Sequence, residues 1–100
     1  MMEPNLDFER IKAIRTATNG AALVMHGGSG VSKKDYQKAI AAGIRKINYY
    51  TYMNLAAGEA VKKECLTQRD EYFFDELSLV ATSAIKENVT SALKIFNGLD

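Results

Sequence analysis

Cysteine, histidine and proline are scarce in this sequence of 100 residues, which holds one of each. The lone Cys65 cannot form an intrachain disulfide, and its apolar neighbours predict a half-buried helical position rather than a reactive thiol. The lone His26 cannot build a metal site by itself, because catalytic zinc normally needs about three protein ligands and an open position. We therefore expect a reducing compartment, and any further metal ligands must lie outside this sequence.

An excess of one charge and a long apolar run are lacking as well. Lys and Arg number 13 and Asp and Glu number 12, so the formal net charge of +1 creates no broad field to attract nucleic acid or an anionic membrane. No apolar run is long enough to span a bilayer, and residues 1–5 lack the features of a signal peptide. We expect a cytoplasmic chain without nucleic-acid or membrane partners.

What the sequence does contain is enough apolar material for one small core, since 47% of its residues are hydrophobic. Helical and extended patterns alternate along the first two thirds, which indicates an α/β fold with parallel strands joined by right-handed crossovers. Ser32, followed by Asp35, resembles a capping box, and Gly43 is a typical helix stop. The predicted elements are a helix over 5–19 capped by Asn5 or Asp7, a strand over 21–25 covered on both faces, a helix over 32–43, a strand over 44–48, a helix capped by Thr51 that includes Cys65, and, after a polar joint at 67–70, a long helix over 72–96.

Polar residues follow both predicted strands, at 26–29 and at 48–51. The carboxyl ends of parallel strands are where α/β folds bind ligands, so we expect these two clusters to point toward the same place. The glycine-rich turn after the first strand can bring backbone N–H groups to an anion such as phosphate. The start of the helix after Thr51 offers further N–H groups and a favourable dipole.

The spacing alone leaves plainer alternatives open. A Gly-Gly-Ser-Gly turn is slightly more often a flexible connection, and Thr51 can be only a helix cap. A histidine at a strand end more often bonds to a backbone carbonyl than to a metal, and the amide of Asn48 more often has a structural partner than a substrate. Ser29 is too close in sequence to His26 to be assigned to a catalytic triad, and no residue of the chain is assigned as catalytic.

The order and separation of these motifs resemble a known family. The segment "LDFERIKAIRTATNGAALVMHGGSGVSKKDYQKAIAAGIRKINYYT" is similar to the zinc-dependent class II aldolases, the fructose-bisphosphate and tagatose-bisphosphate aldolase family. These enzymes have a Leu-Asp-Phe helix start, a strand ending in "HGGSG", and a strand of the form K-[IV]-N ending in threonine. The similarity covers about the first 60 positions well, and "AIKENV" and "LKIF" extend it more weakly.

The resemblance implies a role for each matching residue. His26 corresponds to the third histidine ligand of the catalytic zinc, and Asn48 to the asparagine that contacts the dihydroxyacetone phosphate part of the substrate. Tyr50 differs from the small or acidic residue usual at its position and places a bulky phenol beside the expected phosphate site. The residues implied to bind substrate or phosphate are Gly27, Gly28, Ser29, Asn48, Tyr49, Tyr50 and Thr51.

The resemblance also implies a fold and an activity. A (β/α)8 barrel takes about 250 residues, so the chain corresponds to the last two βα units, over 1–66, followed by a C-terminal helix over 67–100, as one C-terminal fragment. The implied reaction is the reversible cleavage of a ketose bisphosphate, with fructose 1,6-bisphosphate the expected substrate, into dihydroxyacetone phosphate and glyceraldehyde 3-phosphate. The strands with the acid/base aspartate and the other zinc histidines are missing, so we expect the isolated chain to be inactive.

The expected partners are a sugar phosphate and either further copies of the chain or the remainder of an aldolase barrel. A non-enzymatic alternative stays open, in which the chain is a remnant or split-gene piece that binds phosphate weakly or assembles with other chains.

Overall fold

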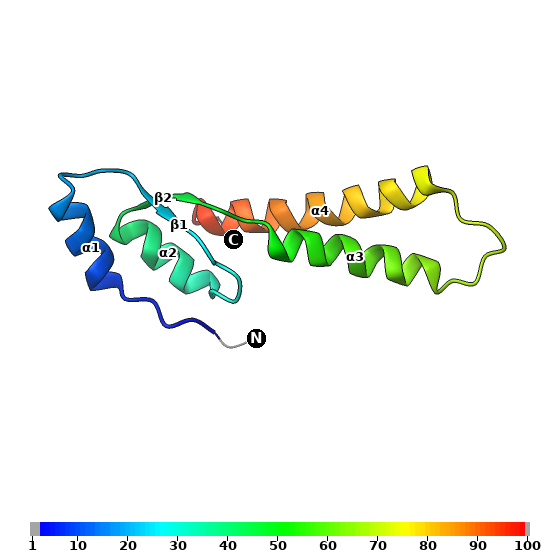
Figure 1. Ribbon diagram of the computed structural model, residues 1–100, viewed down its shortest axis with the longest axis horizontal. Helices are drawn as coiled ribbons and strands as arrows, with labels where there is room; N and C mark the ends of the chain where they lie inside the picture. The colour runs from blue at the N-terminus through cyan, green and yellow to red at the C-terminus, as the bar shows by residue number, and fades with distance from the viewer. Residues whose placement is uncertain (1–2, 100) are drawn as a thin grey trace. The chain divides into compact units, whose positions relative to one another are not determined.

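A computed structural model describes residues 3–99 and confirms the predicted alternation of helices and strands (Figure 1). Both strands are shorter than predicted, and two helices begin two or three residues later than predicted. None of the described helices is long and apolar enough to cross a membrane. The elements are α1 (Phe8–Ala17), β1 (Leu23–Met25), α2 (Lys33–Ala42), β2 (Ile44–Ile47), α3 (Thr51–Cys65) and α4 (Phe74–Phe96).

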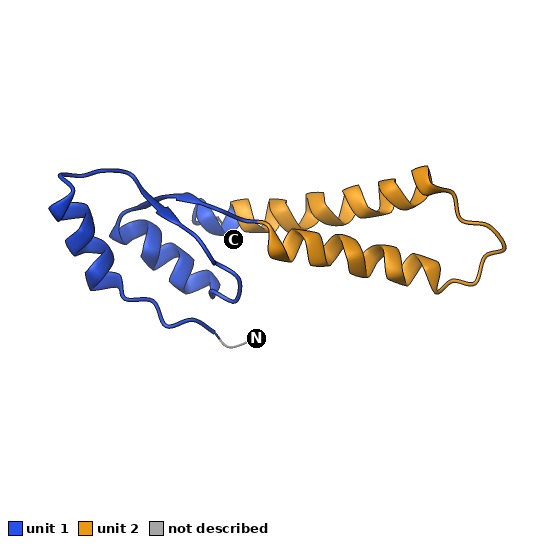
Figure 2. Cartoon of the chain, viewed as in Figure 1, with its two compact units in different colours: residues 1–49, 94–100 blue, residues 50–93 orange. Residues whose placement is uncertain are grey.

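The chain divides into two compact units (Figure 2). The first unit, residues 1–49 and 94–100, holds both strands together with α1, α2 and the last turn of α4. The second unit, residues 50–93, is a helical hairpin of α3 and the rest of α4. These boundaries differ from the predicted division at residue 66, and the assignment of 1–100 to a single fragment of a barrel stays a prediction.

Capping by side chains and glycine explains where the helices of the first unit begin and end. The Asp7 carboxylate accepts a hydrogen bond from the backbone N–H of Arg10 at 2.9 Å, which makes Asp7 the cap of α1. The Ser32 hydroxyl accepts one from the backbone N–H of Asp35 at 3.1 Å, so the predicted cap of α2 is confirmed. α2 ends at Ala42 and is capped by Gly43, whose φ of 139° lies in the region that favours glycine.

The two strands pair in parallel, as predicted, with α2 as the connection between them. Val24 pairs with Lys46 and Met25 with Ile47, and alternate residues of a strand point to opposite faces. Met25 and Ile47 face the helices, whereas Val24 on the other face is 45% exposed. The prediction that β1 is covered on both faces is therefore wrong for the described part of the chain, because helices of the first unit cover only one face of the sheet.

The core of the first unit lies between this covered face and the helices. Its buried residues come from β1, the following turn, α2 and β2, and the Phe96 ring packs edge-on against Tyr36 with the ring centroids 5.0 Å apart. Tyr36 is only 5% exposed. The buried cluster consists of Met25, Val31, Tyr36, Ala39 and Ile44, with Leu6, Phe8, Ile11, Leu23, Ile47, Ile95 and Phe96 packed around it.

The hairpin of the second unit corrects two predictions. Thr51 is the first helical residue of α3 rather than its cap, and Tyr50 at the cap position makes no side-chain capping bond. Cys65 is exposed rather than half-buried. The first error is a helix boundary one residue earlier than predicted. The second follows from the apolar pattern of α3, which is weaker than that of α4 and does not mark one buried stripe clearly. The long helix predicted over 72–96 is confirmed as α4, which begins at Phe74.

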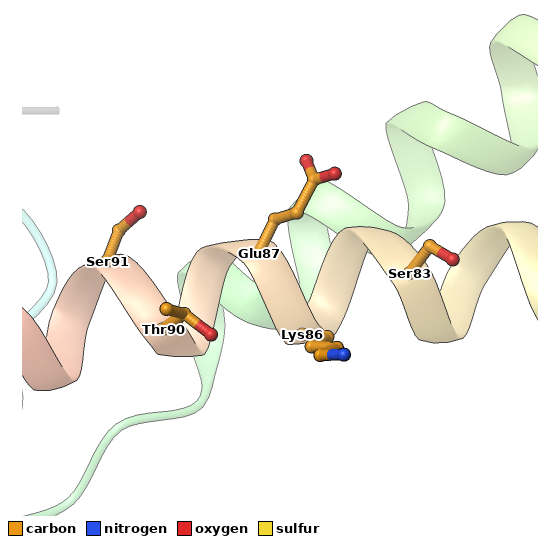
Figure 3. A pocket seen from close by; sticks show the side chains of 5 residues that line it. All are labelled: Ser83, Lys86, Glu87, Thr90 and Ser91. Carbon is orange, nitrogen blue, oxygen red and sulfur yellow. The ribbon is translucent and has the colours of Figure 1, made fainter.

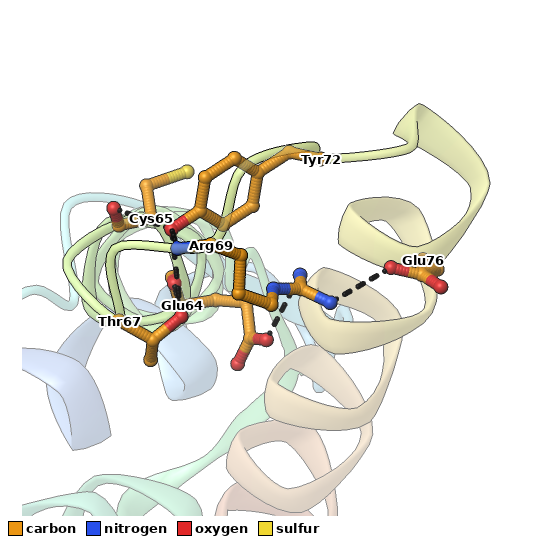
Figure 4. A network of polar contacts seen from close by, with 6 residues as sticks. All are labelled: Glu64, Cys65, Thr67, Arg69, Tyr72 and Glu76. Atoms are coloured by element: carbon orange, nitrogen blue, oxygen red, sulfur yellow. Dashed lines mark hydrogen bonds and ion pairs between the residues drawn. The ribbon is translucent and has the colours of Figure 1, made fainter.

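A network centred on Arg69 joins the two helices of the hairpin (Figure 4). The Arg69 guanidinium pairs with Glu64 of α3 at 3.1 Å and with Glu76 of α4 at 3.0 Å, and it lies 4.7 Å from the Tyr72 ring centroid. The Tyr72 hydroxyl donates to the Cys65 carbonyl at 2.9 Å and accepts from the Arg69 backbone N–H at 3.0 Å. A hydrogen bond with Thr67 is the largest cause that lowers the Tyr72 pKa below its ordinary value. The predicted polar joint is therefore an ordered turn.

Candidate functional site

His26 and Asn48 are the first residues after β1 and β2, and the structure brings them together. The backbone N–H of Asn48 donates to the Met25 carbonyl at 3.0 Å, which continues the strand pairing by one residue past β2. The side-chain amide nitrogen of Asn48 consequently lies 2.9 Å from His26 Nδ1 and 3.4 Å from His26 Nε2. Both residues are exposed, on the face of the sheet that the helices of the first unit leave open. Parallel order thus places these two predicted site residues at one sheet end.

The distances from the Asn48 amide nitrogen to the two ring nitrogens of His26 determine where the amide lies relative to the ring plane. The in-plane bonding directions of Nδ1 and Nε2 diverge on either side of the ring, so one atom close to both nitrogens cannot lie along either direction. The amide nitrogen therefore lies against the face of the ring. Both ring nitrogens therefore keep their in-plane directions for a ligand.

Lys46 completes this cluster, and sequence reasoning missed it as a site residue. Its Nζ donates to Asn48 Oδ1 at 2.8 Å. Residues 46 and 48 are two positions apart on an extended segment and so lie on the same face of the sheet. The strand was predicted to end at Asn48, and a lysine two positions earlier shares its face. This spacing is the sequence feature from which Lys46 could have been predicted as a site residue.

Hydrogen bonds and glycine backbone angles define the glycine-rich turn after His26. Gly27 and Gly30 have φ of 64° and 86°, values that side chains with a β-carbon rarely adopt. The Gly28 carbonyl accepts two hydrogen bonds, from the buried Tyr36 hydroxyl at 2.6 Å and from the Val31 backbone N–H at 3.2 Å. A β-carbon at Gly28 would lie 2.6 Å from the Tyr36 hydroxyl oxygen. The turn is thus attached to the core through α2, and half-buried Ser29 lies at its middle.

The remaining three predicted phosphate-site residues follow Asn48 directly. The Tyr49 ring contacts Phe96 edge-on at a centroid distance of 6.0 Å within the first unit. Tyr50 is 63% exposed, and Thr51 is exposed at the start of α3; both belong to the second unit. Their predicted roles in phosphate binding stay predictions.

Comparison with known proteins shows the family of this chain. The family described as "Fructose-bisphosphate aldolase class-II" matches the chain over residues 1–100. The chain belongs to this family. Membership of the class II aldolase family agrees with the mixed α/β unit and its short parallel sheet.

Individual class II aldolase relatives agree with this assignment. The fructose-bisphosphate aldolase of Staphylococcus epidermidis is 38% identical over 94 residues, which are 94% of this chain and 32% of that protein. The probable fructose-bisphosphate aldolase of Bacillus subtilis is 36% identical, again over 94% of this chain and over 33% of its own length. The crystal structure of the YdjI aldolase from Escherichia coli K12 matches with a TM-score of 0.81 at 39% identity, over 93% of this chain and 34% of that one.

The chain therefore spans about a third of the length of these class II aldolases. Within residues 3–99, no group of three or more His, Cys, Asp and Glu side chains could hold a metal ion. His26 offers one imidazole at a strand end, and the described residues do not complete a zinc site around it.

The described surface also has a pocket on α4 that contains no predicted site residue (Figure 3). All of its lining side chains come from one helix and are exposed and polar, and they are Ser83, Lys86, Glu87, Thr90 and Ser91. A surface of this kind lacks the convergent polar groups on an apolar wall that mark a small-molecule site.

Proposed function

We propose that this chain forms the part of a class II aldolase that contributes one metal ligand and a phosphate-binding loop. The reaction is the reversible cleavage of a ketose bisphosphate, fructose 1,6-bisphosphate in the first place, into dihydroxyacetone phosphate and glyceraldehyde 3-phosphate. The observation that carries this proposal is the contact between His26 and Asn48 at the carboxyl ends of two parallel strands. On this proposal, β1 and β2 are the last two strands of a (β/α)8 barrel.

The phosphate group binds to the turn formed by Gly27, Gly28 and Ser29. Backbone N–H groups of such a turn can converge on an anion, and the absence of side chains at the glycines lets phosphate approach the main chain. The bonds from Tyr36 and Val31 to the Gly28 carbonyl support this role, because a loop that is already ordered loses less entropy when it binds. Tyr49, Tyr50 and Thr51 complete the phosphate site in this proposal.

Asn48 contacts the dihydroxyacetone phosphate part of the substrate, and His26 is one ligand of the zinc ion. When bound, zinc supplies a Lewis acid that stabilises the negative charge left beside the ketone after carbon–carbon cleavage. The chain's own residues hold the phosphate and the ketone end in register for that chemistry. Because one imidazole cannot bind zinc tightly, we expect the isolated chain to be inactive in aldol cleavage.

An NMR titration of this chain with dihydroxyacetone phosphate tests the substrate part of the proposal. We expect shifts of the backbone amide signals of residues 27–29 and of the side-chain signals of His26 and Asn48. Inorganic phosphate should move only the loop amides, and glycerol, which has no phosphate, should move neither. Absence of any shift with dihydroxyacetone phosphate at millimolar concentration would rule out the proposed phosphate site.

A zinc titration and an activity assay test the division of roles. We expect weak zinc binding that shifts the His26 ring signals, and no cleavage of fructose 1,6-bisphosphate. Tight, stoichiometric zinc binding by the monomer, or measurable turnover, would show that the ligand set or the catalytic groups are complete within the chain and would contradict the proposal.

A further inference from the structure

We infer that Lys46 is a positioning residue that orients the side-chain amide of Asn48 and, through it, the imidazole of His26. The ammonium group of Lys46 donates to Asn48 Oδ1 at 2.8 Å, and the opposite end of the same amide lies 2.9 Å from His26 Nδ1. The three side chains thus form one line across the open face of the sheet, with Asn48 in the middle.

The bond from Lys46 determines which atom Asn48 presents to a ligand. The side-chain amide of asparagine has an accepting oxygen and a donating nitrogen at similar distances from its own backbone. Its hydrogen-bond partners therefore decide which of the two atoms points to which side. A cationic donor on the oxygen side is a strong partner, because hydrogen bonds to charged groups are stronger than those between neutral groups. The nitrogen therefore faces His26 and the strand end, so that Asn48 offers hydrogens to an acceptor atom.

This orientation selects the chemistry of the bound group. A donating Asn48 fits a carbonyl, enediolate or phosphate oxygen and does not favour a hydroxyl that must donate. The positive charge of Lys46 on the same face adds an attraction for negative charge at the strand end. The backbone pairing between Asn48 and Met25 holds the main chain, so the direction of the amide is left to Lys46.

NMR of the isotopically labelled chain at a pH above the titration range of imidazole tests this inference directly. In the unmodified chain, we expect the Asn48 side-chain NH2 protons to be shifted upfield by the ring current of His26 and to show a nuclear Overhauser contact with the ring. Lys46→Met should abolish both signals, because the aliphatic length is kept and the donor is lost. Lys46→Arg, whose guanidinium can still donate to the amide oxygen, should retain them.

Lys34→Met is the matched control, since it removes one positive charge from an exposed position on α2. It should leave the Asn48 and His26 signals unchanged. Lys46→Leu serves as a second variant without a donor, and amide signals of α2 that match the unmodified chain verify folding. Any of three results would overturn the inference. The contact between the Asn48 amide and the His26 ring could be absent from the unmodified chain, it could be unchanged in Lys46→Met and Lys46→Leu, or it could be lost in Lys46→Arg.

A binding measurement separates this inference from the proposed function. Unlike the NMR test, the expected effect on substrate binding rests on the proposed function. Dihydroxyacetone phosphate should bind about tenfold more weakly to Lys46→Met than to the unmodified chain or to Lys34→Met. Loss of the Asn48 ring contact in Lys46→Met without any binding of dihydroxyacetone phosphate to any variant would support the positioning role and refute the proposed function. Equal binding to Lys46→Met and the unmodified chain would overturn the positioning role for the substrate.

Discussion

The two compact units of this chain bury their apolar side chains to very different extents. The first unit has a core of buried Met25, Val31, Tyr36, Ala39 and Ile44, packed between the sheet and its helices. In the hairpin only two alanines, Ala57 and Ala92, are buried, and large apolar side chains are exposed along both helices and the joint. These are Leu55, Leu66, Phe73, Phe74, Leu79 and Leu93, with Phe74 reaching 83% exposure.

This difference shows that helix formation and core formation are separate properties. α4 has 23 residues and is amphipathic, yet within the hairpin its one neighbour, α3, has 15 residues, and Leu79 and Leu93 of α4 stay exposed. The first unit obtains its core because a strand–helix–strand segment packs the apolar side chains of one sheet face against those of its helices. His26, Asn48 and the glycine-rich turn of the candidate site lie on the unit that has this core.

Removal of a core side chain should have the largest effect on stability. Ile44 is 5% exposed, and Ile44→Ala should lower the free energy of unfolding by about 2–4 kcal/mol, because it leaves a cavity between β2 and α2. Leu79→Ala in the hairpin, at a position 69% exposed, is the matched control and should change it by less than about 0.5 kcal/mol. Urea denaturation followed by circular dichroism measures both, and equal losses would mean that the two units do not differ as described.

A β-carbon in the glycine-rich turn should have the next largest effect. Gly28→Ala places its methyl group 2.6 Å from the Tyr36 hydroxyl oxygen, so the buried phenol must move, at a cost of about 2 kcal/mol. Gly27→Ala meets no atom within 4 Å and should cost about 1 kcal/mol, from the positive φ alone.

The same denaturation experiment compares these two glycine variants. Tyr36→Phe combined with Gly28→Ala should recover part of the loss, since the clash is with the hydroxyl. A larger loss for Gly27→Ala than for Gly28→Ala would show that backbone conformation, rather than the contact with Tyr36, dominates this turn.

Substitutions at the helix starts should have the smallest effect on stability. They compare one helix start of each unit, Ser32 before α2 and Thr51 at the start of α3. Ser32→Ala removes the hydroxyl that accepts from the Asp35 N–H and should destabilise the chain by about 1 kcal/mol. Thr51→Ala lies within the first turn of α3, makes no cap, and should be close to neutral. Thermal melting of both variants checks this, and a larger loss for Thr51→Ala would restore Thr51 as the cap of α3.

The residues that could be predicted from the sequence are those governed by local rules. The cap at Ser32 and the stop at Gly43 depend on neighbours within one helical turn, and the parallel pairing follows from strand–helix–strand order. The contact between His26 and Asn48 could be anticipated in the same way, because parallel strands end at one edge.

Other features depend on tertiary packing and had no local signal. The bond from the Tyr36 hydroxyl to the Gly28 carbonyl requires α2 to lie at one particular height along the sheet. The exposure of Cys65 requires knowledge of which face of α3 meets α4. A pattern of apolar residues indicates that a helix has a buried side. In α3, whose apolar residues do not gather on one stripe, the pattern does not identify which side that is.

The bond from Tyr36 to Gly28 ties the mobility of the candidate loop to the integrity of the core. Tyr36 cannot release the Gly28 carbonyl by a simple rotamer change, because its ring is enclosed by Phe96 and the buried residues of the first unit. Opening of the loop is therefore coupled to loosening of α2 from the sheet, and the Val31 amide should exchange its hydrogen nearly as slowly as the core strands. A glycine-rich loop is usually regarded as flexible, but here we expect it to open only together with the core of the first unit.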